Sequence, residues 1–427
     1  MTRATERKSL PSDRLFELRG SAEQQAQAQG EVLRPLLDRC FAGLASLPVG
    51  PAWLPGWLRN GAIEPLLRAL GAAHLSWHRR ALADHEGGLW LRRHEALAAG
   101  LGIPLATLYG FAAFELESSI LGFSLACSAL GFGRAQTADG ATRLAYNHDF
   151  PPAFAPFVRL RRSLMSEPIG GPVLRSTLCL TYPMMVGAIA GVNERGLGLT
   201  INQAYATDLR RRRPSLLATL LVQDCLERCD SVAEAVERAL STPVANGALI
   251  SMVDAAGDRA VVELSGTAAR VRRPEPHELM FSFNNYRIPE LQEREVPLGA
   301  VTTLPVAGYD VHECNLTRAR RLGELFDPAR RYADRDITAL LGDHDGGDGD
   351  MTTICRHDDP LNETILSAII APRERTIRVL FGKACEGQSV TYGLDPSPRR
   401  RRELPAHRSQ IDDGVIVHHH EGPLLEA

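Results

Sequence analysis

The stretch LGFSLACSA, residues 121–129, lies where the character of the sequence changes. Before it, residues 1–120 carry mainly helical patterns. After it, short segments rich in β-branched and small apolar residues alternate with Gly, Pro and Asn, which is typical of strands and turns. A helical front followed by a region of mixed strands and helices predicts an α+β fold built from stacked layers.

The helices of the front part have recognisable boundaries. Ser21 is suited to cap a helix that begins directly after it, because strong helix formers follow. A segment rich in Pro, Trp and Gly, residues 51–61, interrupts the pattern, and Gly100 and Pro104 separate the last two helices. Further helices are predicted over 66–82, 89–99 and 105–117.

The region after residue 120 alternates between the two kinds of pattern. Strands are predicted over 121–129, 143–147, 173–182, 186–190, 197–202, 248–254, 259–264, 279–283, 363–370 and 376–381. Helices are predicted over 215–229, 231–240 and 316–326, and the second of these begins with the capping box Ser231-x-x-Glu234. Residues 396–427 are charged and are expected to form a weakly ordered tail.

The composition excludes several classes of function. Of the 427 residues, 44% are hydrophobic and 23% are charged, which is ordinary for a globular protein. A net charge of −3 creates no field that would attract nucleic acid or a membrane surface, so neither partner is expected. The N-terminus has no apolar signal region, and eight cysteines are too sparse for a disulfide scaffold. A reduced, cytoplasmic protein is expected.

The sequence predicts no cofactor and no metal site. The cysteines show no CxxC pairs typical of structural zinc. The loop DHDGGDGD, 343–350, lacks the closing glutamate of a calcium-binding EF-hand, and the three histidines at 418–420 do not face one ion as an i, i+4 pair would. A metal-dependent hydrolase built on this loop and the tail remains a third hypothesis.

An ordered series of polar motifs follows Cys127. Alone, a cysteine at the start of a strand is most often a small core residue. The segment VNERGLG, 192–198, is expected to be a turn between strands. The series consists of NHDF (147–150), AGVNERGLGLTIN (190–202), FSFNNY (281–286), a helix with Arg318, and TTICRH (352–357).

In this order the motifs resemble the autoproteolytic cysteine acyltransferases and hydrolases typified by the fungal penicillin acyltransferase, which are N-terminal-nucleophile (Ntn) hydrolases. These enzymes are more distantly related to the choloylglycine hydrolases. The resemblance extends from about residue 17 to residue 394. It implies a four-layer αββα sandwich over 127–395, preceded by a helical segment, 1–126. It also implies scission of the Ala126–Cys127 bond, which would leave the helical chain 1–126 bound to a catalytic chain 127–427.

The resemblance also implies a role for each of five residues. Cys127 would attack an amide and carry the acyl group as a thioester, with its own freed α-amine as a base near operating pH. Asp149 would hold that amine, and Arg318 would organise the site through the Asp149 carboxylate. Asn284 would donate to the oxyanion, and Asn202 would lie near it.

Three positions qualify this resemblance. Tyr146 stands where the bile-acid branch carries an arginine, which favours the penicillin-acyltransferase-like branch. Ala126 replaces the glycine that precedes the nucleophile in the fungal enzyme, and alanine permits fewer backbone conformations. Because Asn284 and Asn285 are adjacent, an error of one residue in the register is possible.

The sequence therefore favours an enzyme that makes or breaks amide bonds. Its expected partners are a small-molecule acyl donor and an amine or amide substrate, and the α and β chains of one precursor, with a homodimer allowed. The acceptor, water or an amine, is left open. A second hypothesis keeps the fold but not the processing, so that Cys127 acts within an intact chain or the protein binds acylated ligands without catalysis.

Overall fold

The computed structural model describes residues 14–47, 56–120, 127–166, 173–210, 213–301, 310–357 and 362–395. Ala126 and the predicted tail from residue 396 lie outside these ranges. No single described helix combines the length and apolar character needed to cross a membrane. One bent pair, Gly61–Leu101 with Leu105–Leu116, passes that test when both helices are taken together.

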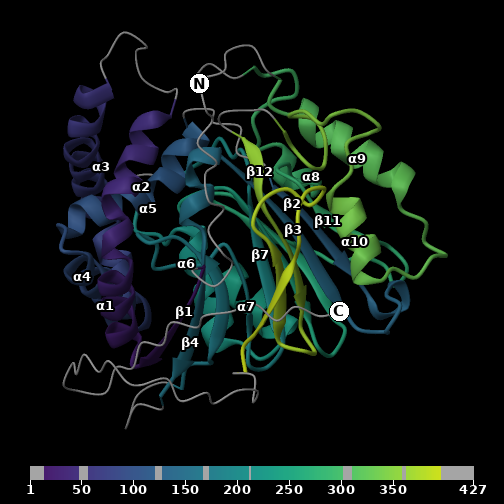
Figure 1. Ribbon diagram of the computed structural model, residues 1–427, viewed down its shortest axis with the longest axis horizontal. Coiled ribbons are helices and arrows are strands. Elements are labelled where there is room, and N and C mark those ends of the chain that lie inside the picture. The colour runs from purple at the N-terminus through teal and green to yellow at the C-terminus, as the bar shows by residue number, and fades with distance from the viewer. Residues whose placement is uncertain are drawn as a thin grey trace, which may run out of the picture.

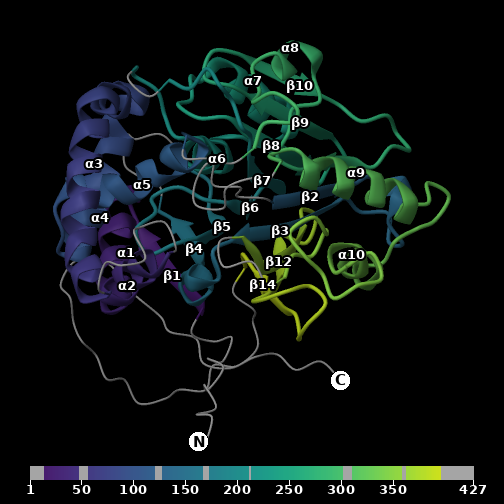
Figure 2. The same cartoon turned by 90° about the horizontal axis from the view of Figure 1, so that it is seen from above.

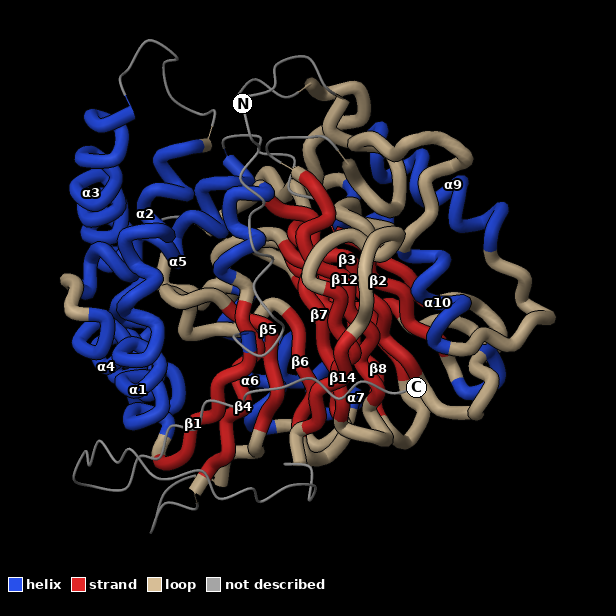
Figure 3. Tube along the Cα trace, in the orientation of Figure 1, coloured by secondary structure: helices blue, strands red, loops and turns tan. Residues whose placement is uncertain are grey.

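Two sheets form the centre of the molecule (Figures 1 and 3). The larger has eight strands in the order β1 (Leu15–Gly20), β4 (Arg159–Met165), β5 (Thr177–Thr181), β6 (Ala190–Asn193), β7 (Leu197–Gln203), β8 (Ala248–Asp254), β9 (Arg259–Leu264) and β10 (Ala269–Arg272). The smaller has six, in the order β11 (Met280–Ser282), β2 (Cys127–Phe132), β3 (Arg143–Phe150), β12 (Glu363–Ala371), β13 (Thr376–Leu380) and β14 (Val390–Gly393).

The sheets face each other, and helices cover their outer faces. Strands β2, β3 and β12 contact β6, β7 and β8 across the centre, and α6 (Ala218–Arg228) and α7 (Val232–Ser241) pack on the larger sheet. On the other side α9 (Glu313–Leu325) and α10 (Asp334–Leu341) share an apolar cluster with the smaller sheet. The predicted α+β fold, with two sheets between two helical layers, is confirmed.

The front helices form a separate block beside the two sheets (Figure 2). They are α1 (Ala22–Leu33), α2 (Leu37–Ser46), α3 (Gly56–Asp84), α4 (Leu89–Leu101) and α5 (Leu105–Ile120), and a short α8 (Pro289–Gln292) lies far from them. The Ser21 hydroxyl accepts from the Gln24 amide, and the Gln24 side chain reciprocates, so the predicted start of the first helix is confirmed. Helices α3 and α5 touch so closely that a Cβ on Gly71 would lie 1.8 Å from the Ala106 oxygen.

Two expectations about the elements are wrong. Residues 15–20, within the segment expected to be helical, form strand β1, which pairs in parallel with β4 and extends the larger sheet. The strand expected over 186–190 begins only at Ala190. The preceding loop passes close to α6, where a Cβ on Gly187 would lie 2.6 Å from the Thr219 oxygen, and this path takes it out of the ladder.

Strand β4 was not predicted, because its arginines give it a polar sequence, RLRRSLM. Arg161 is nevertheless buried, since its guanidinium donates to the side chains of Gln29 and Gln223, at 2.8 Å each. Both terminal nitrogens of the guanidinium thus have acceptors, whereas its Nε has none among the described residues. Polar partners from α1 and α6 therefore make an interior strand out of a polar sequence.

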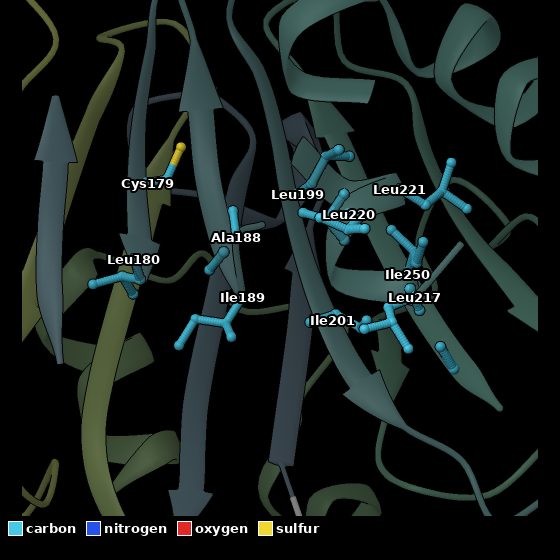
Figure 4. Packing of buried hydrophobic residues seen from close by; sticks show 14 of the residues in the cluster. Cys179, Leu180, Ala188, Ile189, Leu199, Ile201, Leu217, Leu220, Leu221 and Ile250 are labelled. Atoms are coloured by element: carbon cyan, nitrogen blue, oxygen red, sulfur yellow. The ribbon is translucent and has the colours of Figure 1, made fainter. Parts of the chain in front are cut away.

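The apolar core continues from the sheets into the space where the candidate site lies. Leu220 and Leu221 of α6 point toward Leu199 of β7 and Ile250 of β8, and Leu217 lies beside Ile201 (Figure 4). These side chains are at most 7% exposed, as dense interior packing requires.

Candidate active site

The site begins at Cys127, which is the first residue of β2 and is buried. It lies opposite His148 in the register of β2 and β3. Since side chains alternate along a strand, Tyr146 and His148 project from the same face of β3. Both reach the sulfur: the Tyr146 hydroxyl lies 3.2 Å and the His148 Nδ1 lies 3.9 Å from Sγ.

The backbone of Cys127 is held at both ends by buried side chains. Arg318, on α9, donates from Nη1 to the Cys127 carbonyl oxygen at 2.8 Å. The Oδ1 of Asn284 accepts from the Cys127 backbone N–H at 3.0 Å and from Arg318 Nη2 at 3.1 Å. Asn285 instead turns away and donates to the Tyr286 carbonyl at 3.4 Å. The structure thus places Asn284, and not its neighbour, at Cys127.

The side-chain amide of Asn284 has a fixed orientation. Its oxygen accepts from two donors, and its Nδ2 donates to the Gln203 carbonyl oxygen at 2.8 Å. In the intact chain the group that was expected to stabilise an oxyanion is therefore engaged with β7. What Asn284 visibly does here is to anchor the nitrogen of Cys127.

Asp149 lies at the centre of a buried ionic group. Its Oδ1 accepts from the Thr364 hydroxyl at 2.6 Å. Its Oδ2 lies 3.6 Å from Arg356 Nε and 3.9 Å from Arg318 Nη1. Burial raises the pKa of the Asp149 carboxyl, while the two guanidinium groups and the hydroxyl act in the opposite direction. Asp149 therefore connects Arg318 to a second arginine that the sequence did not single out.

The Asn202 side chain has no described hydrogen bond to Cys127 or to the other predicted site residues. It is buried in β7, and its Nδ2 donates to the Ser282 carbonyl oxygen at 3.0 Å, which ties β7 to β11. Its neighbours touch the site through their carbonyl groups: Ile201 accepts from the Tyr146 hydroxyl at 2.9 Å, and Gln203 accepts from Asn284. The other predicted residues form one connected network.

Tyr146 and His148 were missed as functional residues. The sequence gave a signal for both, because they flank Asn147 at two-residue spacing before Asp149 in a predicted strand. His148 Nε2 lies 2.8 Å from the Tyr182 hydroxyl, and burial lowers the pKa of His148 to about 3, so the imidazole is neutral near pH 7. Arg356, inside the TTICRH motif, was also missed.

The thiol of Cys127 is strongly protonated in the intact chain. Burial, aided by the negative charge of Asp149, raises its pKa to about 12. The hydrogen bond from Tyr146 and the positive charge of Arg318 oppose that shift. A base close to the sulfur is therefore needed before it can act as a nucleophile at neutral pH.

A cavity of about 100 Å³ opens beside the sulfur. One wall comes from the front helices α4 and α5, and the other comes from β7, α6 and the loop before β6. Its apolar lining includes Phe111, Phe114, Phe150, Ile189, Ile201, Leu217 and Leu220. At the polar end, Glu115 accepts from the Thr219 hydroxyl at 2.6 Å and from Asn246 Nδ2 at 2.9 Å. The front block and the two-sheet body thus build the cavity together.

Among the described residues, no cluster of His, Cys, Asp and Glu side chains placed to share one metal ion lies at this cavity. A cluster of two histidines and two cysteines lies away from the cavity. The cavity combines a buried cysteine with an anchored backbone, a neighbouring carboxylate held by arginines, and an apolar space beside the sulfur. Cys127 is the cysteine whose side chain borders this cavity among the residues that the structure describes.

The family model of acyl-coenzyme A:6-aminopenicillanic acid acyl-transferase matches residues 137–385, which is more than half of the chain. The chain belongs to this family, and the predicted resemblance is confirmed. The matched range contains Asp149, Asn202, Asn284 and Arg318, whereas Cys127 precedes it. A search of curated proteins gives no match.

Three solved structures resemble this chain at low sequence identity. A Caenorhabditis elegans ortholog of N-acylethanolamine-hydrolyzing acid amidase has 15% identity and a TM-score of 0.39, over 58% of this chain and 93% of that one. A mutant conjugated bile acid hydrolase from Clostridium perfringens has 11% identity and a TM-score of 0.35, over 62% and 96%. Penicillin V acylase from Agrobacterium tumefaciens has 13% identity and a TM-score of 0.36, over 62% and 86%.

Proposed function

We propose that the chain is cleaved between Ala126 and Cys127 and then makes or breaks amide bonds through a Cys127 thioester. The observation that carries this proposal is the double anchoring of the Cys127 backbone, by Asn284 at its nitrogen and by Arg318 at its carbonyl. A cysteine that only fills a core needs no such support. A nucleophile that is also a chain terminus needs it, because scission would otherwise leave residue 127 free to move.

Scission would proceed by an N-to-S acyl shift. Cys127 Sγ attacks the carbonyl carbon of Ala126, the C–N bond breaks, and the proton of the thiol passes to the new α-amine. Water then hydrolyses the thioester and leaves a carboxylate on Ala126 and an unmodified thiol on Cys127. The neutral imidazole of His148 and the hydroxyl of Tyr146, both near the sulfur, are the described groups able to relay this proton.

In turnover the freed α-amine takes the place of an external base. Its ordinary pKa of about 7.7–8.0 lies near that of an ordinary thiol at about 8.5, so it can accept the thiol proton and return it to the leaving amine. The acyl carbon is bonded to Sγ in the intermediate and then passes to water or to an acceptor amine. Asn284 keeps the α-amine in position throughout, through the contact that already holds the backbone nitrogen.

The lining of the cavity favours a substrate with an apolar acyl group. Phenyl and branched aliphatic side chains surround the space beside Sγ, and burial of apolar surface there contributes about 25 cal/mol per Å². Glu115, Thr219 and Asn246 provide a polar end that can position a hydrogen-bonding group. A panel of acyl-p-nitroanilides with increasing chain length, together with acyl-homoserine and β-lactam amides, tests this preference.

Intact-mass measurement of the purified chain tests the processing. Two chains split at Ala126–Cys127 are expected from the wild type, and one uncut chain from Cys127→Ala. Cys179→Ala is a matched control, because Cys179 is equally buried in β5 but does not line the cavity. An uncut wild type with an unreactive Cys127 would support the second hypothesis, that the protein acts unprocessed or only binds acylated ligands.

A further inference from the structure

Four potential metal ligands meet at a point that does not belong to the cavity. They are His344, Cys355, His357 and Cys385, and their ligand atoms all lie within 4.8 Å of one another. His344 follows α10, Cys355 and His357 lie shortly before β12, and Cys385 follows β13. Two separate connections of the chain, the one between α10 and β12 and the one after β13, thus bring two thiols and two imidazoles together.

The distances within this cluster match a tetrahedral zinc site. The sulfurs of Cys355 and Cys385 are 3.8 Å apart, and His357 Nε2 lies 3.7 Å from the first and 3.3 Å from the second. Zinc bonds of about 2.3 Å to sulfur and about 2.0–2.1 Å to nitrogen place tetrahedral ligands about 3.8 Å (S to S) and about 3.6 Å (S to N) apart. A disulfide would require about 2.05 Å, and both cysteines are free.

The surroundings of the two imidazoles also fit a ligand site. The Nε2 of His344 is buried and has no hydrogen-bond partner among the described residues, which is costly unless another group satisfies it. The rings of His344 and His357 meet edge to face, with centroids 4.4 Å apart. Gly349, at φ +89°, closes the loop over them, and a Cβ there would lie 2.7 Å from His357 Cδ2.

We propose that His344, Cys355, His357 and Cys385 bind one zinc ion as a structural Cys2His2 site. Thiolate and imidazole ligands select zinc over the hard cations magnesium and calcium, which prefer oxygen. Four protein ligands complete the tetrahedron and leave no open position for catalysis. Binding converts both thiols to thiolates, and the two protons go to solvent.

The proposed zinc site would hold in place a residue that contacts Asp149 of the candidate active site. Arg356 stands between the ligands Cys355 and His357, and its Nε lies 3.6 Å from Asp149 Oδ2. Its backbone N–H donates to the Thr364 hydroxyl, which in turn donates to Asp149. An ion bound on both sides of Arg356 would fix the segment that carries this positive charge to the carboxylate. Arg356 is on this view a positioning residue.

Metal analysis of the full-length chain, purified under reducing conditions without chelator, tests the proposal. About one zinc per chain is expected, and Co2+ added to the apoprotein should give the visible absorption of tetrahedral cobalt with thiolate charge-transfer bands. Cys355→Ser and Cys385→Ser should each lower bound zinc at least about tenfold at limiting free zinc, whereas Cys179→Ser should retain it.

A measurement on the wild type alone guards against variants that fail to fold. Zinc added back to the apoprotein should raise its Tm by several degrees, because an ion bound to the native state alone stabilises it. The proposal is overturned if the wild-type chain holds no zinc and shows no tetrahedral cobalt spectrum. It is equally overturned if mass spectrometry of the metal-free chain shows a native Cys355–Cys385 disulfide, or if Cys385→Ser binds zinc as tightly as the wild type.

Discussion

Tyr146→Phe removes one hydroxyl from the candidate site and keeps the aromatic ring. That hydroxyl lies 3.2 Å from Cys127 Sγ and 2.9 Å from the Ile201 carbonyl oxygen. A phenol has a single proton, so it can fully serve one acceptor at a time. We expect the proton to turn to Ile201 while the sulfur is a neutral thiol, and to turn to the sulfur when it becomes a thiolate.

The size of the effect follows from these two alternatives. A hydrogen bond to a charged group contributes about 1.5–3 kcal/mol, and the bond given up at Ile201 contributes about 0.5–1.5 kcal/mol. The net stabilisation of the thiolate is therefore about 1–2 kcal/mol. At about 1.36 kcal/mol per pKa unit, Tyr146→Phe should raise the pKa of the Cys127 thiol by about 0.7–1.5 units. Below that pKa, the thiolate fraction should fall about 5- to 30-fold.

The assay is the rate of Cys127 alkylation by iodoacetamide as a function of pH, followed by mass spectrometry on split protein, with kcat/KM measured in parallel. Tyr182→Phe is the matched control, because its hydroxyl contacts His148 Nε2 at 2.8 Å and has no described contact with the sulfur. It should leave the Cys127 profile nearly unchanged. The reasoning is refuted if Tyr146→Phe leaves both the profile and kcat/KM unchanged, or if the two variants shift them equally.

Three further outcomes are expected. Cys127→Ala should abolish scission and turnover while circular dichroism and the free energy of unfolding stay close to wild type; retained activity would refute the assigned nucleophile. Asn284→Ala removes the side chain that holds the Cys127 nitrogen, so it should lower kcat about 10²-fold with KM within a few-fold; Asn285→Ala should stay near wild type, as steady-state kinetics on split proteins would show. Burial keeps the pKa of His148 at about 3, below its ordinary 6.5, so the unfolded chain binds the extra proton and stability falls as pH drops below 6.5. The loss is about 2 kcal/mol at pH 5, and His148→Gln should lose correspondingly less in urea unfolding between pH 7.5 and pH 5.

Local signals account for the parts of the fold that the sequence predicted well. The capping box at Ser21 depends on side chains three residues apart, and both partners are visible in the sequence. Cys127, Asp149, Asn284 and Arg318, which the order of motifs predicted, also lie together in the structure. Register was harder to predict: the choice between Asn284 and Asn285 required the position of β11 against β2.

The features that the sequence missed depend on distant partners. Arg161 makes the sequence of β4 look polar. Its hydrogen-bond partners Gln29 and Gln223 are distant in the sequence, so the burial of this strand could not be predicted from its own residues. The sequence did not predict the Cys2His2 cluster, because strands β12 and β13 separate Cys385 from Cys355 and His357 along the chain. Spacing rules for zinc cover ligands that are close in sequence, and here the pairing of β12 with β13 brings them together.

The charges behind Cys127 act in opposite directions on the pKa of its thiol. Two guanidinium groups, of Arg318 and Arg356, share the single carboxylate of Asp149, which leaves one positive charge in excess in a buried space. The positive charge of Arg318 lowers the pKa of the Cys127 thiol, and the negative charge of Asp149 raises it by more. The α-amine of the proposed chain terminus would bring a base to the sulfur that does not depend on this balance of charges. In the intact chain there is no such amine, and burial keeps the thiol protonated, with a pKa of about 12. Under the proposed scission, the new amine supplies the base that these charges do not, on the nitrogen that Asn284 already holds in this structure.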